Sequence, residues 1–295
     1  MIKVGTVKSV WRYPVKGMAG ESLPAADVQR IGIRGDRILA VQDVDRQEIQ
    51  SCKFRPQLLQ CSAQITVPSD INSGVTIRFP DGECLPSGAD GVNERLSELV
   101  GHSSCIQSLR PASEKAFYQR FKENDHTWLD ELKATFERLP GEPLPDLDNL
   151  PEEMQTYVSV LGTFFLVSPF HIISTASLEY LKTKNPDSDW RIERFRPNLV
   201  VETLPEMEGL VEQAWVGCSL KVGEVIISCS DTAPRCGAVV REQQGIPQDP
   251  QVLRTIVREA EQNLGVYGDI SMEGEVRVGD AVYLCRDSRD QQIAQ

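Results

Sequence analysis

The sequence predicts a β-rich α+β protein whose strands curve into barrel-like sheets. Short alternating apolar strands separated by turn residues dominate roughly the first hundred positions. In the second half, residues 219–228 (SLKVGEVIIS) and 275–284 (EVRVGDAVYL) both consist of a strand, a Gly-acid turn and another strand. Two such similar hairpins favour a barrel or a strongly curved sheet, with helices confined to the segments between strands.

The N-terminal part is predicted to be a β-rich domain over residues 1–110. Residues 4–11 (VGTVKSVW) alternate apolar and polar side chains, as a half-buried strand does. Residues 38–45 (ILAVQDVD) and 74–83 (GVTIRFPDGE) add short strands bounded by turn signals.

A helical and acidic connector is predicted over residues 111–154. Within 113–139, aromatic and leucine side chains stand four positions apart, which indicates one or two amphipathic helices: Phe117 and Phe121, Trp128 and Leu132, Leu132 and Phe136. Residues 139–154 then carry four prolines and five acidic residues without a base. Proline punctuation and charge of one sign are typical of an exposed connection, so the main domain boundary is expected here.

A second β-rich domain is predicted over residues 155–290. It opens with an apolar run, and residues 174–184 (STASLEYLKTK) read as a short helix with Ser or Thr at its start. A second helix follows Asp249, which can cap it, and Gly265 is expected to stop it. Its predicted buried stripe is Val252, Leu253, Ile256, Val257 and Leu264.

The charge distribution excludes one class of partner and suggests another. A net charge of −12 argues against general nucleic-acid binding, because phosphates repel such a surface. Residues 1–60 nevertheless hold ten Lys and Arg against six Asp and Glu, which indicates a local anion site or simply a solvated basic surface. No run of ~18 apolar residues exists to span a membrane, and the N-terminus lacks a signal-peptide layout, so a cytoplasmic location is expected.

The eight cysteines do not follow a known metal or disulfide pattern. They occupy positions 52, 61, 84, 105, 218, 229, 236 and 285, with no C-x-x-C pair and no nearby histidine pair. Phosphate-binding glycine motifs, H-E-x-x-H and G-x-S-x-G are also missing from the sequence. A metal bound here is therefore expected to have few protein ligands, down to a single one.

Basic residues recur beside glycine or proline at four turns. These are YPVKG (13–17), RGDR (34–37), RFRPN (194–198) and APRC (233–236). A cation next to exposed backbone N–H groups suits a phosphate or another polyanion. Each cluster alone is equally compatible with an ordinary surface loop.

In this order, the motifs resemble the MOSC superfamily. YPVKG and GDR are similar to motifs of its N-terminal β-barrel domain, whereas SPFHIISTASL, RFRPN, the APRC cysteine, GVYG and VRVGDAVYL are similar to the MOSC domain. The resemblance is weakest over residues 105–150. It implies an N-terminal β-barrel-like domain followed by a MOSC β-barrel domain with peripheral helices. Within the superfamily, the arrangement is similar to the amidoxime-reducing components and bacterial reductases of N-hydroxylated compounds.

The resemblance implies a molybdenum–molybdopterin cofactor and a role for nine residues. Cys236 would ligate the metal and be the catalytic residue. The implied cofactor-binding residues are Lys16, Gly17, Arg37, Ser168, Arg196, Asn198, Arg235 and Tyr267. In CKFRP (52–56), Lys53 stands where relatives often have arginine, which keeps the charge and loses bidentate geometry.

The chemistry of these residues agrees with that cofactor. A dithiolene-bound metal is a soft site for which a thiolate is a natural further ligand. Metal binding and the neighbouring Arg235 both favour the thiolate of Cys236. Lys16, Arg37 and Arg196 could supply charge-assisted hydrogen bonds to a phosphate. We expect Cys218 and Cys229 to be core residues, and His171 to be structural rather than a proton donor.

The implied activity is reduction of small N-hydroxylated substrates such as amidoximes, hydroxylamines and N-hydroxylated bases. Because the chain shows no cysteine set for an iron–sulfur domain, electrons are expected from a separate donor protein with a flavin, haem or iron–sulfur carrier. The alternative is a sulfur-transfer protein carrying a persulfide on Cys236, or a carrier of molybdenum cofactor. The same fold serves both readings.

Overall fold

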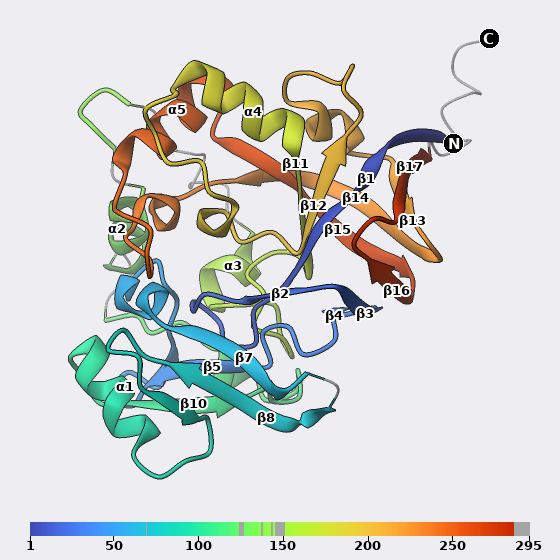
Figure 1. Ribbon diagram of the computed structural model, residues 1–295. Helices are drawn as coiled ribbons and strands as arrows, with labels where there is room; N and C mark the ends of the chain where they lie inside the picture. The colour runs from blue at the N-terminus through green and yellow to red at the C-terminus, as the bar shows by residue number, and fades with distance from the viewer. Residues whose placement is uncertain (69, 124–126, 137, 143, 145–150, 286–295) are drawn as a thin grey trace.

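The computed structural model describes residues 1–285 except 69, 124–126, 137, 143 and 145–150 (Figure 1). Within the acidic run 139–154, which predicts the domain boundary, residues 143 and 145–150 therefore lie outside the described residues. A β-barrel with two helices over it occupies the upper part of Figure 1, and a smaller group of sheets with one helix occupies the lower part. The prediction of a β-rich α+β protein is confirmed.

The upper barrel is closed by the first strand of the chain. Its seven strands follow the order β12-β11-β15-β14-β13-β17-β1, and β1 pairs with β12 to complete the ring. The bounds are β1 Ile2–Arg12, β11 Phe170–Ser174, β12 Leu199–Thr203, β13 Ser219–Val222, β14 Val225–Pro234, β15 Asn263–Met272 and β17 Ala281–Cys285. Strand β2 (Glu21–Leu23) extends the sheet from β1. The N-terminal strand thereby brings the loop that follows it to the C-terminal barrel.

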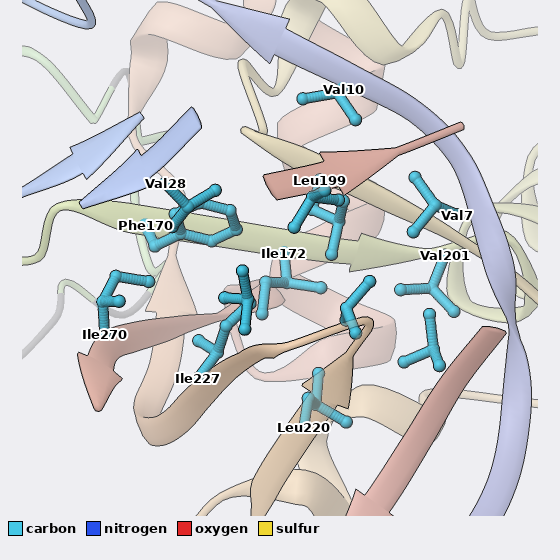
Figure 2. Close-up of a cluster of buried hydrophobic side chains, with 14 of the residues drawn as sticks. Val7, Val10, Val28, Phe170, Ile172, Leu199, Val201, Leu220, Ile227 and Ile270 are labelled. Carbon is cyan, nitrogen blue, oxygen red and sulfur yellow. The ribbon is translucent and has the colours of Figure 1, made fainter. Parts of the chain in front are cut away.

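Three valines of β1 that stand three positions apart are buried in the barrel core. Val4, Val7 and Val10 are buried, and an irregular register between Val7 and Ser9 keeps the last of them facing inward. Figure 2 shows Val7, Val10 and Leu199 among side chains that meet in the barrel interior. Burying one such side chain contributes about 1.5–3 kcal/mol, so the barrel core fixes the strands on which the loops stand.

The lower part contains two three-stranded sheets. One has the order β10-β5-β6 and the other β7-β8-β9. The bounds are β5 Leu39–Asp43, β6 Glu48–Ile49, β7 Ser62–Val67, β8 Asp70–Arg78, β9 Cys84–Pro86 and β10 Ser104–Ser108, with helix α1 at Val92–Val100. Val41, Ile65, Ile77 and Leu96 belong to their shared core. The strands expected within 38–45 and 74–83 are confirmed as β5 and the end of β8.

A third small sheet overturns one predicted hairpin. Its order is β16-β3-β4, with bounds β16 Gly274–Arg277, β3 Ala25–Gln29 and β4 Gly32–Ile33. The hairpin expected over 219–228 is confirmed as β13 and β14. The hairpin expected over 275–284 is wrong, because β16 pairs with β3 whereas β17 pairs with β1 and β13. The Gly-Asp turn there sends the chain from one sheet to another.

The helices of the C-terminal half cover one side of the barrel. Helix α4 (Thr175–Lys184) starts where Ser174 accepts a hydrogen bond from the backbone of Ser177. Helix α5 (Pro250–Ala260) starts at Asp249, which caps Gln251. The predicted stop at Gly265 is wrong: α5 ends at Ala260, Glu261 takes the left-handed conformation, and Leu264 and Gly265 belong to β15. Within 113–139, the predicted helices shorten to a 3₁₀ turn at Lys115–Tyr118 and α2 (Thr127–Ala134). A further short helix, α3 (Glu152–Thr156), was not predicted.

Among the helices that the structure describes, none has the length and apolar character needed to cross a membrane.

Candidate functional site

A cavity of about 400 Å³ lies where the N-terminal loops, the connector and the C-terminal barrel meet. This volume is in the usual range for small-molecule sites. The structure brings all nine residues singled out from the sequence to its lining: Lys16, Gly17, Arg37, Ser168, Arg196, Asn198, Arg235, Cys236 and Tyr267. Residues more than 200 positions apart in the chain therefore share one site.

Lys16 is held at the cavity wall by the turn that follows β1. Its backbone N–H donates to Leu39, and its Nζ donates a 2.8 Å hydrogen bond to the carbonyl oxygen of Phe164. Burial, together with the smaller effects of the charges of Arg37 and Lys53, lowers the pKa of Lys16 to about 7. The ammonium is thus poorly compensated by the protein and suited to an incoming anion.

Gly17 lets two loops approach each other at this wall. It has a φ of +87°, and a side chain there would place a Cβ 3.1 Å from the backbone nitrogen of Cys52. Both the left-handed conformation and the close approach favour glycine. The consequence is that the loop carrying Cys52 and Lys53 packs directly on the Lys16 turn.

Arg37 and Arg196 come from opposite halves of the chain and lie over the same ring. Their guanidinium carbons are 5.1 and 4.5 Å from the centroid of the Tyr13 ring. Both arginines have positive φ, 50° and 56°, a conformation that non-glycine residues adopt at a cost and that clusters at functional sites. Tyr13 thereby fixes two cations at the same edge of the cavity.

Asp36 organises this edge, and the sequence analysis did not single it out. Its buried carboxylate accepts a 2.6 Å hydrogen bond from the backbone of Tyr13, a short one from Arg37 and one of 2.9 Å from the side chain of Asn198. Burial raises the pKa of Asp36, whereas Arg37 and these hydrogen bonds lower it. Its place inside the GDR motif, directly before Arg37, was the available signal.

The Asn198 amide is engaged within the protein. Its Nδ2 donates to Asp36 and to the carbonyl of Trp11, and its Oδ1 accepts from the backbone of His171. Only 1% of the residue is exposed. Asn198 therefore joins the two halves of the cavity wall rather than presenting a free amide to it.

Cys236 stands at the end of β14, just before a 3₁₀ turn over Gly237–Val240. The thiol is half-buried and lines the cavity. The backbone N–H of Gly237 donates a 2.7 Å hydrogen bond to Thr135 in the connector. On the other side, the backbone N–H of Arg235 donates to the carbonyl of Gln262, and the side-chain amide of Gln262 donates to the carbonyl of Arg235. The loop that presents the thiol is therefore held from both sides.

Arg235, next to the thiol, retains unused hydrogen-bonding capacity. It donates to the carbonyl of Phe195 at 3.1 Å and reaches His171 at 3.4 Å and the Tyr267 hydroxyl at 3.5 Å. Its Nε is buried and has no hydrogen-bond partner in the described part of the chain. A buried donor without an acceptor is costly, which is consistent with an anion or acceptor that binds here.

His171 has the properties of a structural residue. Burial and the charge of Arg235 hold its pKa well below the ordinary value, so the imidazole is neutral. Gly265 has a φ of +89°, and a Cβ on it would lie 2.4 Å from Nε2 of His171. The glycine expected to end a helix is thus required by the approach of this histidine.

The Ser168 hydroxyl is also engaged within the protein. It donates a 2.7 Å hydrogen bond to the carbonyl of Gly268.

A second thiol, Cys52, lines the same cavity and was missed by the sequence analysis. Burial raises the pKa of Cys52; the charge of Arg196 lowers it, and charge on Cys236 raises it. The two cavity cysteines therefore affect each other electrostatically. Its position beside Lys53 in the CKFRP segment was the only sequence signal. Of the other cysteines, Cys229 is buried in the barrel core, as expected, and Cys218 is half-buried.

Across the residues that the structure describes, no group of three or more His, Cys, Asp or Glu side chains is arranged to hold a metal ion.

Comparison with family models and known proteins agrees with the sequence motifs. Residues 4–104 match the MOSC N-terminal beta barrel domain, and residues 162–283 match the MOSC domain. The mitochondrial amidoxime reducing component 2 of Bos taurus is 27% identical over 302 residues, covering 95% of this chain and 83% of that protein. The human protein of the same name is 26% identical over 306 residues, covering 95% and 84%. A solved structure of the YUAD protein from Bacillus subtilis has 13% identity and a TM-score of 0.43, covering 95% of this chain and 94% of that one.

Proposed function

The chain belongs to the MOSC-domain superfamily, and from this premise we propose that its cavity binds a molybdenum cofactor and that the protein reduces N-hydroxylated compounds. The observation that carries the proposal is that two thiols, Cys236 and Cys52, and several basic side chains line a single cavity. The curated relatives are named as amidoxime reducing components, which agrees with this class of substrate.

The residues present fit a molybdopterin. Lys16 is buried without an anion partner among its hydrogen bonds, and the Nε of Arg235 is buried without an acceptor in the described chain. Arg37 and Arg196 add charge at one edge. A phosphate would satisfy these donors through charge-assisted hydrogen bonds. Cys236 offers the soft sulfur donor that a dithiolene-bound metal accepts.

Each lining residue has a proposed part in holding the cofactor. Cys236 would ligate the metal through Sγ. Lys16 and Arg37 would bind the phosphate, and Gly17 would let the backbone approach it. Arg196, Ser168 and Tyr267 would make further contacts. Asn198 would position the residues that contact the cofactor, because its amide is already hydrogen-bonded to Asp36 and to the His171 backbone.

When bound, the cofactor supplies the two-electron chemistry that breaks the N–O bond of the substrate. The chain itself orients the metal end through the doubly anchored Cys236 loop. His171 is held by contacts with Leu264 and Arg235, and burial and the charge of Arg235 keep its pKa well below the ordinary value. The apolar side chains on the cavity wall limit the water that reaches the reacting end.

The electron donor is proposed to be a separate protein with a flavin, haem or iron–sulfur carrier. The relatives are named as components of a reducing system, which supports such a division of labour. The cytoplasmic location stays a prediction, and the relatives are named as mitochondrial.

The experiment is elemental analysis of protein purified from a host that makes the cofactor, followed by an amidoxime reduction assay with a chemical reductant. We expect stoichiometric molybdenum and turnover in the wild type. Cys236→Ser should lose turnover while remaining folded. Cys218→Ser, which changes a half-buried cysteine outside the cavity lining, is the matched control and should keep both. Turnover in Cys236→Ser equal to that of the wild type would contradict the proposal.

A second candidate function is sulfur transfer through a persulfide on Cys236. The observation in its favour is the second cavity thiol, Cys52, which could attack the persulfide, form a disulfide with Cys236 and release sulfide. Mass spectrometry of the intact protein distinguishes the two functions. A persulfide on metal-free protein supports sulfur transfer, and stoichiometric molybdenum without persulfide supports the reductase.

A further inference from the structure

The segment between the two family-model matches forms part of the cavity wall. The matches cover 4–104 and 162–283, so residues 105–161 lie outside both. From this segment, Arg120 lines the cavity together with four apolar residues, here called the apolar wall: Leu132, Phe136, Met154 and Val158. The part of the chain that least resembles the family therefore shapes the site.

Hydrogen bonds fix this segment on both sides of the cavity. Toward the MOSC domain, Thr135 accepts the 2.7 Å bond from Gly237, and Arg138 donates to Gln262 at 2.5 Å. Toward the N-terminal sheets, the backbone of Phe121 donates to the Glu48 carboxylate at 3.1 Å. The wall is thus a built part of the site rather than a loop lying over it.

The apolar wall lies close to Cys236. Thr135 contacts the residue that follows Cys236, and Phe136 is the next residue of the wall. Ala238 and Val239, just after Cys236, continue the apolar lining on the MOSC side. The apolar wall and the thiol therefore share one end of the cavity.

The chemistry of the wall does not suit the cofactor. A pterin ring edge and a phosphate require hydrogen-bond donors and acceptors, and burying them against leucine, phenylalanine, methionine and valine would leave them unsatisfied. An apolar group of the substrate gains from the same surface.

We propose that Leu132, Phe136, Met154 and Val158 form a substrate subsite that selects N-hydroxylated compounds bearing an aryl or long alkyl group. The proposal rests on the function proposed above. It makes the segment 105–161 the specificity-determining part of the chain. Leu132 and Met154 are half-buried, whereas Phe136 and Val158 are buried.

The first test compares benzamidoxime with acetamidoxime. Leu132→Gln places an amide on the wall, and the ratio of kcat/KM for the aryl to the small substrate should fall about tenfold, the scale on which apolar pockets discriminate. Leu139→Gln is the matched control, because Leu139 belongs to the same segment, is 49% exposed and does not line the cavity. It should keep the wild-type ratio. An unchanged ratio in Leu132→Gln would overturn the proposal.

The second test needs no turnover. Ligand-observed NMR measures binding of benzamidine and acetamidine, the corresponding amidines, to the protein as purified. We expect the wild type to prefer benzamidine and Leu132→Gln to lose the preference. If this result is obtained but no N-hydroxylated compound is reduced, the subsite stands and the proposed function fails. If the wild type shows no preference for benzamidine, the subsite proposal fails whatever the activity.

Discussion

The carboxylate of Asp36 accepts a 2.9 Å hydrogen bond from the side-chain amide of Asn198, which lies 162 positions later in the chain. This bond joins the turn between β4 and β5 to the MOSC part of the cavity. The same carboxylate receives Arg37 and the backbone of Tyr13. The relative positions of the cationic residues therefore depend on one buried acid.

Replacing that acid should loosen the site. Asp36→Ala leaves the Tyr13 N–H without an acceptor and removes one of the two acceptors of the Asn198 amide, and each lost hydrogen bond costs about 1–3 kcal/mol. We expect the free energy of unfolding, measured by urea denaturation, to fall by several kcal/mol, and molybdenum content to fall with it. Asp27→Ala is the control, since the Asp27 side chain is half exposed and its ion pair with Arg34 spans 3.9 Å; it should change stability by less than about 0.5 kcal/mol. Equal losses in the free energy of unfolding of both variants would contradict the proposed role of Asp36 in holding Asn198 and Tyr13.

Lys16 should make stability depend on pH. Burial lowers its pKa from 10.5 to about 7, so between these values the unfolded chain binds a proton that the folded protein lacks. The free energy of unfolding of cofactor-free wild type should therefore rise with pH from about 7 to 10.5, relative to Lys16→Met, and the difference should be constant below that window. At ~1.36 kcal/mol per pKa unit, the full change is on the order of 5 kcal/mol. Urea denaturation at a series of pH values measures it, and a difference that does not vary across the window would contradict the account.

Gly265 should be intolerant of a side chain. Gly265→Ala forces a Cβ to within 2.4 Å of His171 and keeps a residue at a φ of +89°. Gly82→Ala has nearly the same φ, +91°, with no atom within 4 Å of the added Cβ, so it isolates the cost of the backbone conformation, about 1 kcal/mol. Thermal unfolding should show a clearly larger loss for Gly265→Ala, because the steric clash adds to that cost. Equal losses of stability in Gly265→Ala and Gly82→Ala would mean that the His171 side chain moves aside without a free-energy cost.

The sequence motifs predicted much of the site because each carries its own chemistry. A cation beside glycine or proline marks a turn able to face an anion, but the nine residues themselves were implied by the resemblance to the MOSC superfamily. All nine reach the cavity. Asp36 and Cys52 were missed because a lone acid or thiol has many ordinary explanations. The connector wall was missed because leucine and phenylalanine at helical spacing predict packing equally well.

The fold was predictable in class and less so in pairing. Alternation identified β1 as a strand, but no local pattern shows that it pairs with β12 and β17 to close the distant barrel. The Gly-Asp turn before β17 predicts a hairpin between β16 and β17, because local turn chemistry does not reveal that β16 is paired with β3. From the sequence alone Gly265 predicts a helix stop, because His171, whose approach requires the glycine, lies on another strand, β11.

The central claim is that Cys236, and not the neighbouring Cys52, holds the metal. Molybdenum X-ray absorption spectroscopy of the wild type, Cys236→Ser and Cys52→Ser counts the sulfur atoms bound to the metal. The account predicts that Cys236→Ser loses one sulfur ligand, whereas Cys52→Ser keeps the wild-type number. An unchanged sulfur count in Cys236→Ser, or a loss in Cys52→Ser alone, would contradict it.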